Sequence, residues 1–308
     1  MKYVILYDMK MCFKFVVVLF SQFIQTALWA QSTLEVIIKK DIVYSDVDGR
    51  QLKLDIGQPQ GEGPFPAVVF FHGGGWQQGN KSHMHKWIRK FVSSGYVGVS
   101  VAYRFAPEYK WPCQVEDAKE AIRFLRAHAK EYNIHENKMG VMGESAGGYL
   151  ALMVALTSPT DSLEGKTDFG EISSNVQAVV SFFSATDFMG PRQELSPELK
   201  QEMKKYYNKS LEEVRADFTG TADAHDPRLA MMSVISYIDP NDPPVLMFHG
   251  DKDPFVSVEH AVRLKEKLEV ANVPHELVIV EGAGHGWTGL AEQRTTAQMM
   301  KFFGDNLK

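Results

Sequence analysis

The segment Gly-Glu-Ser-Ala-Gly at 143–147 lies between two apolar runs that predict different structures. Residues 138–142 before it predict a strand, and the unbroken apolar run 149–157 after it predicts a helix. A Ser at such a strand-to-helix turn sits on a sharply bent backbone, where little side-chain bulk fits two residues before or after it. The turn lifts the Ser145 hydroxyl above the sheet and places the free amides of the helix N-terminus below it. Ser145 is therefore a candidate nucleophile.

Strand and helix patterns alternate along most of the chain. Residues 67–71 and 97–102 are continuous apolar runs, as expected for strands buried on both faces. Apolar residues recur at helical spacing in 114–132. Such alternation predicts an α/β fold with a mostly parallel central sheet and helices on both faces. Further strands are predicted at 35–46, 51–56, 176–183, 245–248 and 276–280, and further helices at 82–94, 258–271 and 291–307.

The segment 188–243 interrupts this alternation between two predicted core strands. It is rich in charged residues, Met and Tyr, and it contains predicted helices at 197–207 and 211–218. An insertion at the carboxyl end of sheet strands lies where ligands bind in α/β folds. We therefore expect a partial cap over the site; a peripheral decoration is the alternative.

The first thirty residues resemble a secretory signal peptide. Basic residues precede an apolar core that begins at 15–20, and Ala30 offers a small residue at a cleavage point. The expected location is therefore periplasmic or secreted, with one domain at 31–308. An uncleaved anchor is the alternative, but polar residues at 21–25 shorten the apolar run below what a membrane span needs.

Composition narrows the functional classes. The chain has 308 residues and a net charge of -5, which argues against a nucleic-acid partner. Cys113 is the one cysteine outside the leader, so no internal disulfide is expected in the mature chain. His83 and His85 lie at the start of a predicted helix, and we expect them to be solvated rather than metal ligands.

A nucleophilic Ser needs a base, and the base needs a carboxylate that fixes its tautomer. His285 follows the last predicted strand on a loop flanked by glycines, which allows its ring to reach over the sheet. Asp253 follows the strand before it and is the expected carboxylate. Asp251 on the same loop also competes, although it is expected to brace the turn, and Asp187 is a third candidate.

Donors for a developing oxyanion are expected from a second glycine-rich loop. His-Gly-Gly-Gly at 72–75 follows a buried strand upstream of Ser145. A glycine run lets backbone amides approach a negatively charged oxygen closely. We expect the donors to be the amides of Gly74, Gly75 and Ala146.

Five motifs in this order, HGGGW, YRFAPEYKWP, GESAGG, HGDKDPFV and GAGHGW, resemble the α/β-hydrolase superfamily. The resemblance covers nearly all of the mature chain and is greatest to esterases and lipases with an HGGG loop, including the hormone-sensitive-lipase-like group and secreted acetylxylan and feruloyl esterases. It implies that Ser145 is the nucleophile, Asp253 the carboxylate and His285 the general base. Arg104 and Asp117 are expected to pair as scaffold.

The resemblance implies an ester hydrolase that works through an acyl-enzyme and needs no metal or cofactor. Its expected substrates are small-molecule or oligosaccharide esters, with acetyl or feruloyl groups on carbohydrate. Trp76 and Trp287 are expected to bind the acyl group or sugar, or to pack. Two alternatives remain: a serine exopeptidase or acylamidase of the prolyl-oligopeptidase type, and a non-catalytic binding protein with this fold. No stable membrane insertion is expected once the leader is removed.

Overall fold

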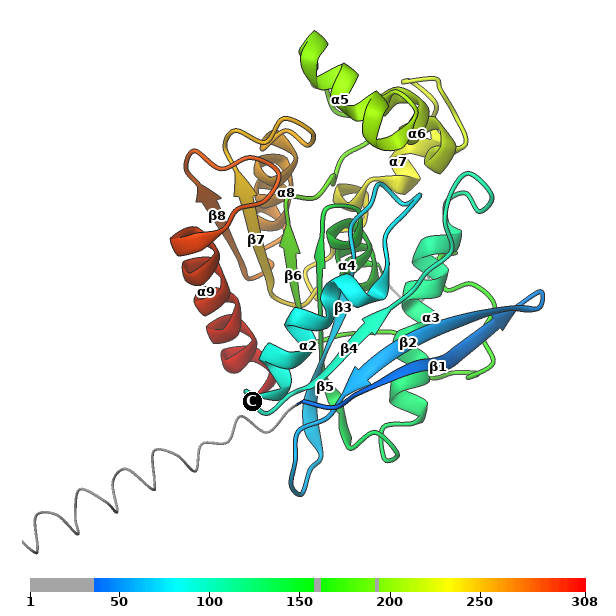
Figure 1. Ribbon diagram of the computed structural model, residues 1–308, viewed down its shortest axis with the longest axis vertical. Helices are drawn as coiled ribbons and strands as arrows, with labels where there is room; N and C mark the ends of the chain where they lie inside the picture. The colour runs from blue at the N-terminus through cyan, green and yellow to red at the C-terminus, as the bar shows by residue number, and fades with distance from the viewer. Residues whose placement is uncertain (1–35, 158–161, 192–193) are drawn as a thin grey trace, which may run out of the picture. The chain divides into compact units, whose positions relative to one another are not determined.

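Within residues 36–157, 162–191 and 194–308, the ranges that the computed structural model describes, eight strands form one sheet (Figure 1). The strand order is β1-β2-β4-β3-β5-β6-β7-β8. The pairs from β4 to β8 are parallel, whereas β1 pairs with β2 and β2 with β4 in antiparallel fashion. The strands are β1 (Ile38–Val47), β2 (Arg50–Gly57), β3 (Phe65–Phe71), β4 (Val97–Val101), β5 (Ile134–Glu144), β6 (Ala178–Phe182), β7 (Val245–Gly250) and β8 (His275–Val280).

The burial of the strands differs between the centre of the sheet and its outer hairpin. Every residue of β4, β6 and β7 is buried, which matches their continuous apolar runs and the parallel centre of the sheet. The outer hairpin of β1 and β2 turns at Asp48 and Gly49, whose φ values are 52° and 83°. Two positive φ angles in a two-residue loop match the twist of the flanking strands. The predicted mostly parallel sheet is confirmed.

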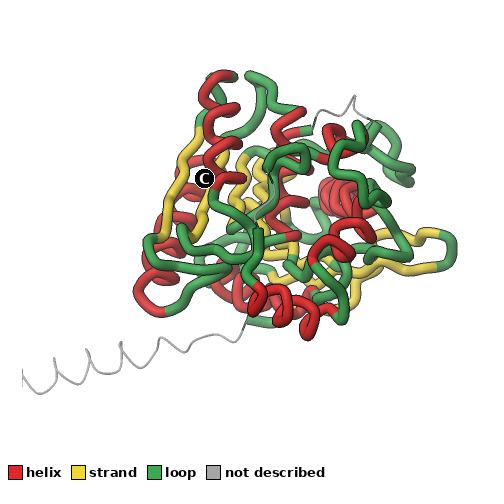
Figure 2. Tube along the Cα trace, turned by 90° about the horizontal axis from the view of Figure 1, so that it is seen from above, coloured by secondary structure: helices red, strands yellow, loops and turns green. Residues whose placement is uncertain are grey.

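Helices cover both faces of the sheet (Figures 1 and 2). α2 (His85–Val92) and α9 (Gly289–Leu307) lie on one face. The other face carries α3 (Cys113–Ala127), α4 (Ala146–Leu156) and α8 (Glu259–Val270). All of α4 is buried because it lies between the sheet and α3. A helix buried on every side needs apolar residues all round, which is why its sequence has no polar stripe.

The segment between β6 and β7 supplies the expected helices α5 (Pro197–Tyr207) and α6 (Leu211–Thr219). Ser196 caps α5, and Ser210 forms a reciprocal capping box with Glu213 at the start of α6. Helix α7 (Arg228–Met232) and the short 3-10 helix η2 (Val234–Ser236) were not predicted, because such short elements show little periodicity. In Figure 1 these helices lie beyond the carboxyl ends of β6 and β7.

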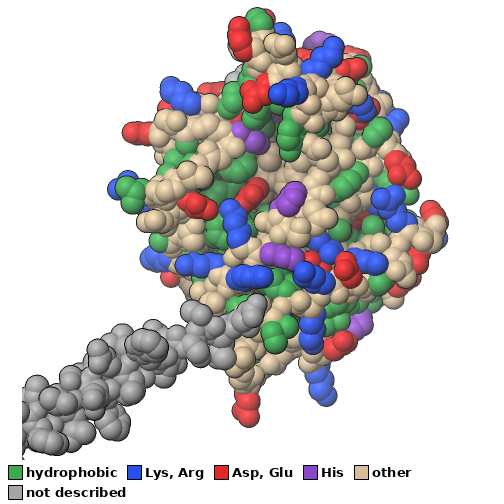
Figure 3. All heavy atoms as spheres, in the orientation of Figure 1, with side chains coloured by type: hydrophobic (Ala, Val, Ile, Leu, Met, Phe, Trp, Pro, Cys, Tyr) green, Lys and Arg blue, Asp and Glu red, His purple; other side chains and the backbone are tan. Residues whose placement is uncertain are grey.

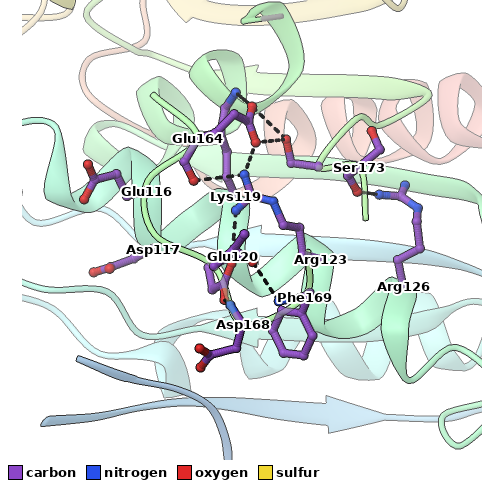
Figure 4. Close-up of polar contacts among 12 residues, drawn as sticks. Glu116, Asp117, Lys119, Glu120, Arg123, Arg126, Glu164, Asp168, Phe169 and Ser173 are labelled. Atoms are coloured by element: carbon purple, nitrogen blue, oxygen red, sulfur yellow. Dashed lines mark hydrogen bonds and ion pairs between the residues drawn. The ribbon is translucent and has the colours of Figure 1, made fainter. Parts of the chain in front are cut away.

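A buried ionic cluster joins α3 to the loop that precedes β6 (Figure 4). The Glu164 carboxylate accepts hydrogen bonds from Lys119 Nζ at 2.5 Å, from Arg123 and from the Ser174 hydroxyl. Arg123 also contacts the Glu120 carboxylate at 3.0 Å. Lys119 is fully buried and Arg123 is 2% exposed. These contacts hold the loop against the helix, and they use charges that the sequence analysis had not assigned.

Two local expectations were wrong and one was confirmed. The helix predicted over 114–132 ends at Ala127, because His128 leaves helical geometry, with φ -104° and ψ 20°, and the chain then turns to enter β5. His85 is not simply solvated: its Nε2 lies 2.7 Å from the carboxylate of Asp55, a buried residue. Arg104 pairs with Asp117 as expected, with NH2 to Oδ1 at 2.6 Å.

The predicted leader at 1–30 lies outside the described residues. In the described ranges, none of the helices combines the length and the apolar character that crossing a membrane requires.

Candidate active site

Ser145 lies at the tight turn between β5 and α4, with φ 55° and ψ -120°. A side chain at Gly143 would place its Cβ 2.1 Å from the carbonyl oxygen of Gly147, and one at Gly147 would place it 2.1 Å from that of Phe71. Neither approach is possible for a real carbon atom, so both positions require glycine. Gly148 is also crowded, since its Cβ would lie 2.0 Å from the Ser184 hydroxyl, which can rotate, and 2.9 Å from the carbonyl oxygen of Gly143. This third crowded glycine was not predicted from the sequence.

The structure brings Ser145, His285 and Asp253 together from three separate loops. The Ser145 hydroxyl donates to His285 Nε2 at 2.9 Å. His285 Nδ1 donates to Asp253 Oδ2 at 2.7 Å. In this tautomer the imidazole can take the serine proton, and the carboxylate can stabilise the resulting positive charge.

Asp253 is 5% exposed and its charge is supported from several directions. Its Oδ1 accepts hydrogen bonds from the amides of Phe255 and Val256, both at 2.9 Å. His249 Nε2 lies 3.4 Å from Oδ2. Burial alone would raise the pKa of Asp253, but hydrogen bonds from His249 and His285 hold the pKa below its ordinary value. Asp253 is therefore ionised when it contacts His285.

The two competing carboxylates lie elsewhere. Asp251 accepts the amide hydrogen of Gly282 at 2.6 Å and so braces the turn, as expected. Asp187 accepts from Arg263 Nε at 2.8 Å and contacts the amides of the following residues. Each carboxylate thus has a structural partner, and Asp253 is the acid that contacts His285.

The loop after β3 presents backbone amides beside Ser145. Gly74 and Gly75 have φ values of 127° and 60°. A Cβ at Gly74 would lie 2.0 Å from the carbonyl oxygen of Gln78, so this turn excludes any side chain there. In the described part of the chain, neither amide donates to another protein group. The amide of Ala146 begins α4 and has no acceptor within the helix.

Two residues that the sequence analysis did not assign support this loop. His72 is 1% exposed, and its ring stacks on Tyr103 with the centroids 4.6 Å apart. The Tyr103 hydroxyl donates to the carbonyl oxygen of His72 at 2.8 Å. Burial lowers the pKa of His72 to about 4. His72 is therefore a neutral, buried ring that anchors the start of the glycine loop.

A cavity of about 590 Å³ opens above Ser145 and His285. The glycine loop borders it on one side, and Phe183 and Phe255 extend its apolar wall. The insertion supplies further wall residues: Glu202, Met203, Tyr206, Tyr207, Leu211 and Val214. The insertion therefore borders the part of the cavity that contains Ser145.

The two tryptophans differ in their environment. Trp76 is only 9% exposed and stacks on Phe218 with the ring centroids 4.0 Å apart. Most of its surface is thus used in packing, although its edge reaches the cavity. Trp287 is partly exposed at the cavity wall, and its indole N–H donates to the Thr295 hydroxyl at 2.9 Å. Trp287 is the better placed of the two to contact a ligand.

One polar group at the cavity wall was also not predicted from the sequence. Glu144, which precedes Ser145, accepts the indole N–H of Trp87 at 2.9 Å. Lys86 lies 4.0 Å from Glu144 and 3.5 Å from Glu292. The sequence offered one signal for Glu144, its place as the residue before Ser in the Gly-Glu-Ser-Ala-Gly motif. Among the described residues, no cluster of His, Cys, Asp and Glu has the arrangement that holds a metal ion.

Comparison with known proteins identifies a family. The model of the family described as BD-FAE matches residues 54–268. Esterase LipC of Mycobacterium tuberculosis is 28% identical over 269 residues, which cover 86% of this chain and 64% of LipC. Ethyl acetate hydrolase of Pseudomonas putida is 26% identical and covers 80% of this chain and 74% of its own length. The chain spans about half to two thirds of the length of the first curated relatives it matches.

Solved structures share the fold. Esterase Est2 of Thermogutta terrifontis, solved with propionate bound, has a TM-score of 0.70 at 29% identity and covers 90% of this chain and 96% of its own. A truncated carbohydrate esterase from gut microbiota has a TM-score of 0.73 at 24% identity, covering 87% and 95% of the two chains. The similarity to the carbohydrate esterase shows a shared fold alone.

Proposed function

Because this chain belongs to the BD-FAE family, we propose that it hydrolyses carboxylic esters through a covalent acyl-enzyme on Ser145. The observation that carries the proposal is the continuous chain of hydrogen bonds from Ser145 through His285 to Asp253. This chain lies at the wall of a cavity, beside unengaged backbone amides. Relatives that are named as esterases support the same reaction.

The first half of the reaction forms the acyl-enzyme. His285 Nε2 takes the hydroxyl proton as Ser145 Oγ attacks the ester carbonyl carbon. The amides of Gly74, Gly75 and Ala146 donate to the oxygen that becomes negatively charged. The bond to the alcohol oxygen then breaks, and the proton on His285 passes to that oxygen.

The second half regenerates the serine. A water molecule gives one proton to His285 Nε2 and its oxygen attacks the acyl carbon. Collapse of this second tetrahedral intermediate breaks the bond to Ser145 Oγ, which recovers the proton from His285. The products are the carboxylic acid and the enzyme in its starting state. Asp253 stabilises the charged imidazole in both halves without itself taking up the proton.

The finer proposal concerns the substrate, and it names acetyl or feruloyl esters of carbohydrates. Its support is the size of the cavity and the aromatic wall formed by Phe183 and Phe255. An aromatic acyl group can stack against such rings. The indole N–H of Trp287 is already bonded to Thr295, so this residue offers its ring surface to the sugar.

The direct test is release of acetate and ferulate from p-nitrophenyl acetate, methyl ferulate and acetylated xylan oligosaccharides. We expect the wild-type protein to hydrolyse these esters and Ser145→Ala to lose this activity. Covalent labelling by a fluorophosphonate should likewise require Ser145. Turnover by Ser145→Ala at the wild-type rate would refute the mechanism. Faster cleavage of matched amides than of esters would instead favour a peptidase or acylamidase.

A separate proposal is that the chain is exported with removal of residues 1–30. N-terminal sequencing of the protein recovered outside the cytoplasm should begin at Gln31, and an intact N-terminus there would contradict cleavage.

A further inference from the structure

A surface groove continues from the catalytic cavity along two helices. Its volume is about 740 Å³, and it runs between α2 and α9 on one face of the sheet. Lys86, Trp87 and Glu292 belong both to the cavity wall and to the groove wall, so the two spaces adjoin each other at the Lys86–Glu292 ion pair. Figure 3 shows basic and acidic side chains close together on this face.

Each wall of the groove is a single helix face. Residues four apart on a helix lie one above the other, and both walls follow this spacing. The α9 wall extends from Gly289 to Met300, a rise of about 16 Å at 1.5 Å per residue. Below the surface, Phe91 and Phe303 meet with their ring centroids 5.6 Å apart and join the two helices. The polar residues of the walls are Lys86 and Lys90 from α2, Ser94 from the turn after it, and Glu292, Gln293 and Thr296 from α9.

The groove walls carry charged and amide groups beside the apolar side chains of Trp87, Ala297 and Met300. Lys86 and Glu292 form an ion pair at 3.5 Å, with side chains that are 55% and 42% exposed. An exposed pair of this kind contributes little to stability, so a ligand can displace it at low cost. An alkyl chain in the groove would strip water from these groups without replacing their hydrogen bonds, which is costly. Hydroxyl groups of a sugar would replace those bonds.

The position of the groove relative to His285 identifies which half of the ester it would hold. The alcohol oxygen must take its proton from His285 Nε2 as it leaves, so the alcohol lies beside this ring. Gly286 and Trp287, which follow His285, line the cavity, and α9 begins directly after them at Gly289. The groove therefore starts where the alcohol half leaves the reacting centre.

We propose that the groove between α2 and α9 binds the sugar chain of the alcohol half of a carbohydrate ester. The proposal rests on the ester hydrolysis proposed above and extends it: the enzyme acts on oligomeric rather than monomeric sugar esters. The catalytic cavity holds the scissile bond, and sugar units beyond the esterified one lie along Lys90, Gln293 and Thr296.

The test measures kcat/KM on acetylated xylo-oligosaccharides of one to four units, with p-nitrophenyl acetate as the small ester. Wild-type kcat/KM should rise at least tenfold from the shortest to the longest sugar ester. Ala297→Trp places a large side chain in the groove at an exposed position and should reduce this gain to about twofold. Gln298→Trp, the matched control, adds the same side chain at the neighbouring exposed position outside the groove and should keep the gain.

A second variant tests the chemistry of the walls without adding bulk. The pair Lys90→Ala and Gln293→Ala removes two hydrogen-bonding groups and should also lower the gain with chain length. A wild-type enzyme whose kcat/KM does not change with sugar length would overturn the proposal. So would an Ala297→Trp enzyme that keeps the full gain, or one that loses preference along a series of longer acyl chains instead.

These outcomes are separable from failure of the proposed function. Hydrolysis of p-nitrophenyl acetate that depends on Ser145, without any effect of sugar length, would retain the ester hydrolase and reject the groove. Absence of all ester hydrolysis in the folded wild-type protein would reject the proposed function itself, and the groove proposal with it.

Discussion

The ring of Tyr207, at the end of α5, lies directly against the backbone of Gly75. A Cβ added at Gly75 would lie 2.9 Å from Tyr207 Oη and 3.1 Å from the ring atoms Cε1 and Cζ. Burial raises the pKa of Tyr207 to about 12, so the phenol stays protonated at neutral pH. The inserted helices thus contact the loop that would stabilise the oxyanion.

Gly75→Ala should therefore lower kcat/KM by roughly a hundredfold, the effect of losing one oxyanion donor. The added methyl group meets the ring of Tyr207 and displaces the amide. Combining it with Tyr207→Ala, which removes that ring, should restore part of the loss. Gly170→Ala is the matched control for backbone strain, since Gly170 has φ 58° and no atom near its Cβ position. Equal loss of activity in the single and double Gly75 variants, measured on p-nitrophenyl acetate, would argue against the clash.

Asp253→Asn should reduce kcat by about 10⁴-fold, because an amide at this position no longer stabilises the imidazolium and favours the wrong tautomer of His285. Asp251→Asn keeps an oxygen that can accept the Gly282 amide, so its kcat should stay within threefold of wild type. Steady-state rates of the two variants on one ester decide between these carboxylates. The reverse order of effects would move the acid role to Asp251.

Stability should fall in mild acid. Burial lowers the pKa of both His72 and His260 to about 4, whereas an unfolded histidine titrates near 6.5. The unfolded chain therefore binds more protons between pH 6.5 and 4, and the free energy of unfolding decreases as pH falls through this window. Each histidine contributes on the order of 2 kcal/mol between pH 7 and 5. Asp242, whose pKa burial raises to about 6, acts in the opposite direction.

Urea unfolding at pH 7 and pH 5 measures the decrease in the free energy of unfolding. His260→Gln should make this decrease smaller. The glutamine oxygen can still accept the amides of Thr186 and Asp187 that contact His260. His225→Gln, at an exposed position, should leave the pH dependence unchanged. Identical pH dependence in His260→Gln and wild type would contradict the assignment.

Glu164→Gln should lower the free energy of unfolding by about 3 kcal/mol, the typical cost of breaking a buried ion pair by removing one partner. The variant leaves Lys119 and Arg123 in a buried site without the Glu164 charge. Glu171→Gln, on the same loop but exposed, is the control and should be near neutral. Thermal unfolding of both variants at pH 7 gives the comparison; an unchanged midpoint for Glu164→Gln would show that the cluster contributes little.

The fold and the positions of the candidate triad were predictable because they depend on local pattern. Continuous apolar runs identified the buried strands, and tight glycine turns identified the loops that carry Ser145 and His285. Helix α5 was predicted with its observed bounds, because Ser196 and Pro197 mark its start and Asn208 ends it in a left-handed conformation. These signals all lie within a few residues of the feature that they specify.

Contacts between distant segments were not predictable in the same way. The stack of Trp76 on Phe218 joins residues that are far apart in the sequence, and no periodicity reports such a pair. The support of Asp253 by His249 and the contact of Tyr207 with Gly75 depend on three-dimensional placement. The groove between α2 and α9 likewise depends on two helices that the chain separates by most of its length.

The buried cluster around Glu164 also limits how this chain can change over generations. Replacing Glu164 alone leaves two cations without their shared anion, and replacing Arg123 alone deprives both Glu120 and Glu164 of a partner. Each single step passes through a less stable protein, whereas an apolar replacement of the whole set is tolerated in principle. Descendants should therefore keep these residues together or exchange them together, so that loop and helix are inherited as one unit.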